Sequence, residues 1–391
     1  MLPRLSVYIL ISLPVLLVQG STADKKKSPA TSPATPPPRP PAPLGDPSWA
    51  LGLRLYQALR SDSGSVNTVF SPLLVASSLG ALGGGSAGTT ASQLQDLLKT
   101  SSPAKTGAHA GELVSTALES FAKANGTSFH LHASSALFSK QAPPVSQAFV
   151  KDSQARFRVQ HQPLGKGDSK ADLKQLHGWV KAGLGGLEGA PLGAEIKAKA
   201  GALILASALR FKGLYRHHED MENMVQVLEV PLWQGKASVV FLLPFHVESL
   251  DRLEKLLTLE LLSKWLEKTN ISSVIISMPK ANLTSTLSLQ KQLSALGLTD
   301  AWDQNAADFS GVSDKSKGKV HLGAVLQWAS LELAAHSGKA DVDLEEENIE
   351  KPKLFYADHP FIIFVRDNTT GALLLMGALD HAEGEALHDE L

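Results

Sequence analysis

A serine between glycines is the residue whose spacing comes nearest to a catalytic motif in this chain. The segment Gly84-Gly85-Ser86-Ala87-Gly88 has the G-x-S-x-G form of a hydrolase nucleophile elbow. That elbow requires a strand before the serine, whereas the apolar run 71–82 predicts a helix there. No Asp and His with interpretable spacing complete a triad. We therefore expect Ser86 to lie in a loop between helices, with a hydrolase as the alternative.

Two clusters contain metal-ligating residue types without metal-ligating spacing. Asp341-Val-Asp343-Leu-Glu345-Glu-Glu347 lacks the central glycine of a calcium loop. His217-His218-Glu219-Asp220 differs from the H-E-x-x-H pattern of zinc enzymes. Both clusters are expected to be solvated surface. The chain also has no cysteine, which removes thiolate nucleophiles, disulfides and thiolate-bound metal clusters. The sequence predicts no metal, no cofactor and no catalytic residue.

An alternating strand is predicted near the carboxyl end, at residues 354–359. Because successive strand side chains face opposite sides, Leu354, Tyr356 and Asp358 are expected to share one face. A carboxylate there can accept two hydrogen bonds from a guanidinium, and the apolar neighbours can pack beside its stem. The competing interpretation is an ordinary half-buried strand.

Charge and composition limit the function classes. The 391 residues include 37 Lys and Arg against 38 Asp and Glu, giving a formal net charge of −1. Such a chain is a poor surface for neutralising phosphates, so nucleic-acid binding is disfavoured. A hydrophobic content of 43% is sufficient for a sizeable core.

The two ends of the chain carry targeting signals. Residues 1–20 have the form of a secretory signal, with Arg4 before a mostly apolar run and a small-residue cleavage site at Gly20. The run is too short for a membrane span, and no later stretch is long enough. The last four residues, His388-Asp389-Glu390-Leu391, form an HDEL retrieval signal. The sequence therefore predicts a resident of the endoplasmic reticulum lumen that binds the retrieval receptor.

The chain also contains N-glycosylation sequons, as expected of a protein that enters the endoplasmic reticulum. Asn125 and Asn270 are the candidates for N-glycosylation, while Asn282 and Asn368 lie in strand-like contexts.

The chain is expected to contain one folded domain with flexible ends. Residues 21–45 form a Lys- and Pro-rich tail that cannot bury a core. The domain should span 46–381, and 382–391 form the retrieval tail. Helices are predicted early, at 46–56, 73–82, 89–99, 110–123 and 170–184, and later at 250–267 and 287–296. Strands are predicted at 202–211, 225–232, 237–244, 273–279, 320–333, 361–367 and 372–379. This order favours an α+β fold with large antiparallel or mixed sheets.

Three separated stretches, in the right order, resemble conserved segments of the serpin family. They are residues 67–79, residues 295–311 and residues 355–362, and the resemblance extends over about 46–381. It implies the serpin fold, with N-terminal helices, large sheets and an exposed reactive loop.

Within that family, residues 246–257, residues 351–361 and the HDEL tail resemble the collagen-binding chaperones of the endoplasmic reticulum. The resemblance implies a non-inhibitory, stress-response chaperone whose client is Arg-containing triple-helical procollagen. It assigns collagen contacts to Leu354, Tyr356, Asp358 and Ser277. It also implies release of the client as the pH falls, with His359 and His246 as candidate sensors.

Two departures from the family pattern affect this interpretation. Protease trapping requires the segment after Glu332 to enter a sheet, and Lys339, Asp341 and Asp343 would then be buried unpaired. This disfavours the alternative of a serine-protease inhibitor. In addition, a family segment has no counterpart between Lys212 and Gly213, so the fold is expected to be incomplete there. A defective or truncated chaperone variant is therefore a further alternative.

Overall fold

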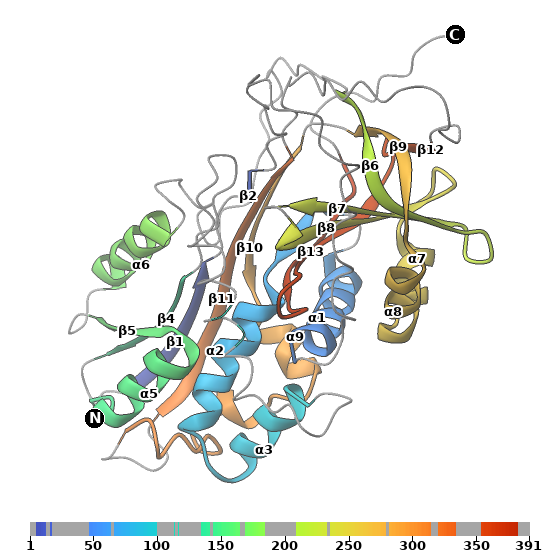
Figure 1. Ribbon diagram of the computed structural model, residues 1–391. Helices are drawn as coiled ribbons and strands as arrows, with labels where there is room; N and C mark the ends of the chain where they lie inside the picture. The colour runs from blue at the N-terminus through green and yellow to red at the C-terminus, as the bar shows by residue number, and fades with distance from the viewer. Residues whose placement is uncertain are drawn as a thin grey trace.

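The computed structural model contains two β-sheets with helices packed against them (Figure 1). It describes residues 5–12, 16–17, 47–63, 66–99, 113, 116, 134–140, 144–164, 169–183, 209–232, 235–278, 281–313, 320–333 and 353–381. Several predictions lie outside these ranges: the tail 21–45, a helix over most of 110–123, Asn125, the charged segment 339–347, the reactive loop and the retrieval tail.

The larger sheet has eight strands and carries most of the core. Its order is β12 (Lys353–Tyr356), β9 (Asn270–Met278), β6 (Leu209–Asp220), β7 (Val225–Leu232), β8 (Ala237–Pro244), β13 (Phe361–Asp367), β14 (Leu373–Leu379) and β3 (Thr68–Phe70). Its central strands β8, β13 and β14 are buried along their whole length. Tight turns join the antiparallel pairs β7–β8 and β13–β14. Gly235 and Gly371 provide the positive φ angles, 84° and 80°, that these turns require.

The smaller sheet has six strands. Its order is β10 (Ala281–Ser288), β11 (Val320–Leu333), β1 (Leu5–Ser12), β4 (Ser134–Lys140) and β5 (Val159–Leu164), and β2 (Leu16–Leu17) also pairs with β11. Strand β1 lies within the segment predicted to be a signal sequence, parallel to β11 and antiparallel to β4. The structure contains the uncleaved chain, so removal of residues 1–20 stays a prediction.

Helices cover these sheets on different sides. They are α1 (Pro47–Ser63), α2 (Pro72–Gly84), α3 (Gly88–Leu97), α5 (Gln147–Phe157), α6 (Ser169–Gly183), α7 (Asp251–Leu256), α8 (Leu259–Lys268), α9 (Gln290–Ala295) and the 3-10 turn η2 (Asp300–Trp302). Trp49 of α1 meets Phe364 of β13 edge-on, with ring centroids 5.5 Å apart. Trp179 of α6 meets Phe138 of β4 in the same way at 5.7 Å. Figure 1 shows α6 beside β4 and β5, across the molecule from α7 and α8.

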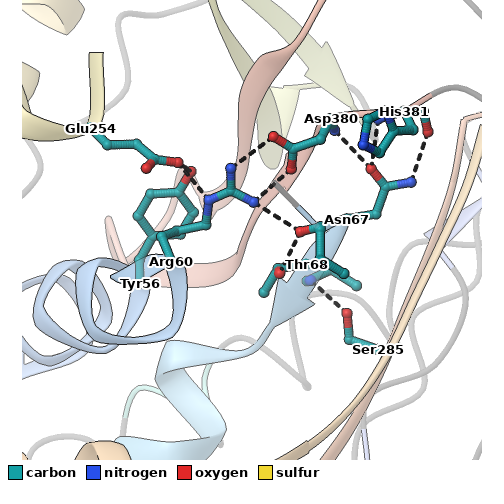
Figure 2. Close-up of polar contacts among 10 residues, drawn as sticks. Tyr56, Arg60, Asn67, Thr68, Glu254, Ser285, Asp380 and His381 are labelled. Atoms are coloured by element: carbon teal, nitrogen blue, oxygen red, sulfur yellow. Dashed lines mark hydrogen bonds and ion pairs between the residues drawn. The ribbon is translucent and has the colours of Figure 1, made fainter. Parts of the chain in front are cut away.

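A buried polar cluster ties the start of the domain to its end (Figure 2). The Arg60 guanidinium of α1 donates two hydrogen bonds to the Asp380 carboxylate, at 2.6 and 2.7 Å. Its Nε donates to Glu254 of α7 at 2.5 Å, and the Tyr56 hydroxyl donates to the same carboxylate oxygen at 3.0 Å. Burial, followed by the charge of Glu254, raises the pKa of Tyr56 well above its ordinary value. Tyr56 therefore stays protonated and donates.

Asn67 holds the same chain end from the other side. Its side-chain oxygen accepts from the amides of Asp380 and His381, at 2.7 and 3.0 Å. Its amide group donates to the His381 carbonyl at 2.8 Å. The last described turn is thus fixed against the segment between α1 and β3, as Figure 2 shows.

Candidate binding site

Strand β12 is an edge strand of the eight-stranded sheet. It contains Leu354 and Tyr356 and leads into Asp358, and these three residues are called the strip below. The strand pairs in parallel with β9, so that Tyr356 lies opposite Ser277 and Leu354 lies opposite Ile275. The register therefore brings Ser277 next to Tyr356, although the two residues are far apart in sequence. The structure thus places all four residues that were assigned to collagen contact in one small region.

Exposure alternates along this segment, as its pattern predicts. Leu354 and Tyr356 are each 49% exposed, and the Asp358 side chain is 75% exposed. Phe355 and Ala357, which lie between them, are buried. Two large apolar side chains and a carboxylate therefore reach solvent on one face.

Aromatic packing fixes the inner face of β12. Phe241 of β8 lies against Phe355 and Phe361, with ring centroids at 6.2 and 5.8 Å. An ion pair of 3.4 Å from Lys353 to Glu219 adds a link to β6. No sequence pattern indicated these partners, because each pairing joins residues that are distant in the chain.

His359 connects the strip to the end of β8. Its Nε2 lies 2.7 Å from the Pro244 carbonyl oxygen, and its Nδ1 lies 2.7 Å from one oxygen of Asp358. Both neighbours are hydrogen-bond acceptors, and a neutral imidazole has only one N–H to donate. Only the doubly protonated ring can donate to both.

The second candidate pH sensor is His246. It is exposed in the loop after β8. Across the described residues, no hydrogen bond or ion pair joins it to Asp358. The geometry therefore favours His359 over His246 as the group acting on this carboxylate.

Ser86 is not positioned as a nucleophile. It follows α2, and its hydroxyl donates to the Gly83 carbonyl at 3.0 Å, as at the end of a helix. The segment before it is a helix, so the strand–serine–helix elbow is absent. The loop interpretation is confirmed.

The histidine cluster at the end of β6 is only partly surface, which corrects the expectation. His217 is 5% exposed and its Nε2 has no hydrogen-bond partner, whereas Glu219 pairs with Lys353. Alternation along β6 places His217 and Glu219 on one face of the strand and His218 and Asp220 on the other, so the four residues do not form one cluster. Within the described part of the chain, no three His, Asp or Glu side chains gather as a metal site. No helix in that part is long and apolar enough to cross a membrane.

Family comparison agrees with this architecture. A model described as Serpin (serine protease inhibitor) matches residues 48–218 and 212–381. The chain therefore belongs to the serpin family, which is described by its inhibitors and is not a family of enzymes. This confirms the expected mixed α+β serpin fold and the absence of an enzymatic role.

Individual serpins differ in how similar they are to this chain. Serpin H1 of Mus musculus is 32% identical, with 97% of this chain and 95% of that protein covered. Serpin H1 of Bos taurus is also 32% identical, with 98% and 99% covered. Serpin B10 of Bos taurus is 26% identical, with 83% and 96% covered. The chain is thus more similar to these Serpin H1 proteins than to this Serpin B10.

Solved structures share the fold. A tumour suppressing serpin superposes with a TM-score of 0.71 at 18% identity, covering 87% of this chain and 99% of that one. Human thyroxine-binding globulin gives the same TM-score at 17% identity, covering 87% and 98%.

The two family matches meet over residues 212–218, where a family segment was expected to be missing. The structure crosses this junction with one uninterrupted strand, β6, which pairs with β9 over Leu209–His217 and with β7 over Arg216–Asp220. The sheet therefore remains continuous at the junction.

Proposed function

We propose that this serpin is a non-inhibitory, collagen-specific chaperone that binds Arg-containing triple-helical procollagen. The observation that carries the proposal is the exposure of Leu354 and Tyr356 on β12 and of the Asp358 carboxylate two residues after the strand ends. A guanidinium can take two charge-assisted hydrogen bonds from such a carboxylate. Its stem and the neighbouring prolyl rings can cover the apolar pair.

Recognition of a triple helix fits this surface better than recognition of a flexible chain. A triple helix is a stiff rod of polyproline II-like chains with outward side chains. Little conformational entropy is lost when a rigid rod meets a rigid strand, so a small surface can give useful affinity. Binding only the folded rod would also stabilise it against unfolding by mass action.

Location supports the same function. The similarity to Serpin H1 suggests the secretory pathway, and the predicted HDEL retrieval signal agrees with a function in the lumen of the endoplasmic reticulum. Asn270 is exposed and remains a glycosylation candidate together with Asn125. Asn368 is only half-exposed, and its amide donates to both Gly235 and Ser238, whereas the exposed Asn270 donates only to the nearby Lys268 carbonyl.

The pH dependence of binding is assigned to His359. A singly protonated ring has one N–H, and when this N–H is donated to the Pro244 carbonyl the Asp358 carboxylate is available to the client. A doubly protonated ring donates to Asp358 as well and retains one oxygen that the guanidinium needs. Client release on acidification follows from this competition.

A pull-down tests the function. Immobilised collagen peptides containing Gly-X-Arg are offered to the protein in triple-helical and in heat-denatured form. The intact protein should be retained by the triple-helical peptide alone, and Asp358→Asn should not be retained. Equal retention by both forms, or of both proteins, contradicts the proposal.

The inhibitor alternative rests on the family description and makes a different prediction. A trapping serpin forms a covalent complex with its protease that survives denaturing electrophoresis. When this protein is incubated with serine proteases of trypsin-like and chymotrypsin-like specificity, we expect it to be cleaved without forming a covalent complex. A stable complex would establish inhibition.

A further inference from the structure

The turn between β6 and β7 presents a second exposed apolar side chain next to a carboxylate. Met221 is 64% exposed, and Glu222 after it is also exposed. Among the described residues, the Glu222 carboxylate makes no ion pair and no hydrogen bond. The turn thus repeats in two adjacent residues the combination that β12 presents with Tyr356 and Asp358.

This turn is connected to the strip through the end of β8. Phe245 donates its amide hydrogen to the Met224 carbonyl at 3.0 Å. The preceding residue, Pro244, receives the 2.7 Å contact from His359, which neighbours Asp358. On the other side, the ion pair between Lys353 and Glu219 joins β12 to the strand that leads into the turn.

The turn is also rigid, unlike a usual hairpin tip. One oxygen of Asp220 accepts from the amides of Glu222 and Asn223, at 3.1 and 3.2 Å. The other accepts from the Asn223 side chain at 2.8 Å and from the indole N–H of Trp265 at 2.7 Å. Burial raises the pKa of Asp220, but these hydrogen bonds outweigh it and lower the pKa to about 2. The carboxylate therefore stays ionised and holds the turn across the physiological range.

Resting on the proposed function, we propose that the turn 221–224 is a second contact for the same triple-helical client. Glu222 receives a second guanidinium, and Met221 packs against its stem. A triple helix that carries arginines is positively charged, and this charge complements the exposed carboxylates of Asp358 and Glu222. Because rod and protein are both stiff, only one spacing of arginines reaches both carboxylates. The turn therefore adds selectivity for arginine spacing as well as affinity.

Peptides that differ in the spacing of their arginines test this second contact directly. Triple-helical peptides carry either one Arg per chain or two, separated by three, six or nine residues. The intact protein should bind one two-Arg spacing about tenfold more tightly than the one-Arg peptide, the size of one charge-assisted hydrogen bond. Glu222→Gln should abolish that gain, and Met221→Ser should reduce it. Both variants should bind the one-Arg peptide within about twofold of the intact protein, as expected for peripheral contacts.

Matched variants separate the outcomes. Val66 is 52% exposed and lies between α1 and β3, so Val66→Ser should leave every affinity unchanged. If no spacing gives a gain that depends on Glu222, the second contact is refuted, while one-Arg binding lost in Asp358→Asn still supports the proposed function. If the intact protein binds none of the peptides, both are refuted.

Discussion

At the scale of single residues, we propose that competition between a client guanidinium and His359 for Asp358 controls release. His359→Gln can still donate to the Pro244 carbonyl but gains no charge in acid. We expect its affinity for a triple-helical Gly-X-Arg peptide to vary little between about pH 7.5 and 5.5, whereas the intact protein should weaken severalfold.

The matched control is His246→Gln, because His246 has no described contact with Asp358. It should keep the pH dependence of the intact protein. An unchanged acid response in His359→Gln would exclude this residue as the sensor.

At the scale of secondary-structure elements, the Arg60 cluster holds α1, α7 and the end of β14 together. Arg60→Met leaves the Asp380 carboxylate, with its side chain 2% exposed, buried without its cation. Removing one partner of a buried pair costs about 3–5 kcal/mol. Urea denaturation should show a loss of that size, while Lys99→Met, at a side chain 73% exposed, should change stability by less than about 0.5 kcal/mol.

Elements with strong periodicity could be predicted from the sequence. The apolar runs that became α2, β8, β11, β13 and β14 were located closely, because burial on every face leaves a continuous apolar run. The helix expected over 250–267 is two helices, since Thr258 has extended backbone and caps α8 by accepting from the Leu261 amide at 3.1 Å. The elements β4, β5 and α5 were missed, because their sequences are rich in polar residues and their pairing is specified by the sheet or the neighbouring helix.

The candidate site was predictable only where it depends on the local alternation of side chains along a strand. Alternation gave the shared face of Leu354, Tyr356 and Asp358, which is a local property of a strand. The contact between His359 and Pro244 could not be predicted, because it spans 115 residues. The role of Asp220 in holding its turn was equally hidden within a cluster that resembled solvated surface.

At the scale of the whole molecule, the buried His217 and the half-buried His161 make the fold sensitive to acid. Burial lowers the pKa of His217 and of His161 below their ordinary value of 6.5. The unfolded chain therefore binds protons more readily than the folded one. The stability that these residues contribute is fully present above about pH 6.5 and is lost as the pH falls below it.

Chemical denaturation at about pH 7.5 and 5.5 measures this loss. The intact protein should be less stable at the lower pH. His217→Gln should show a smaller difference between the two conditions. A difference as large as that of the intact protein would exclude His217 as a contributor.

The central claim is that Asp358 recognises an arginine on a triple helix. A double-mutant cycle measures that contact, with Asp358→Asn in the protein and Arg replaced by norleucine in the peptide. We predict a coupling energy of about 2 kcal/mol at neutral pH, as expected for a charge-assisted pair. A coupling energy of zero, with each single change acting independently, would contradict the account.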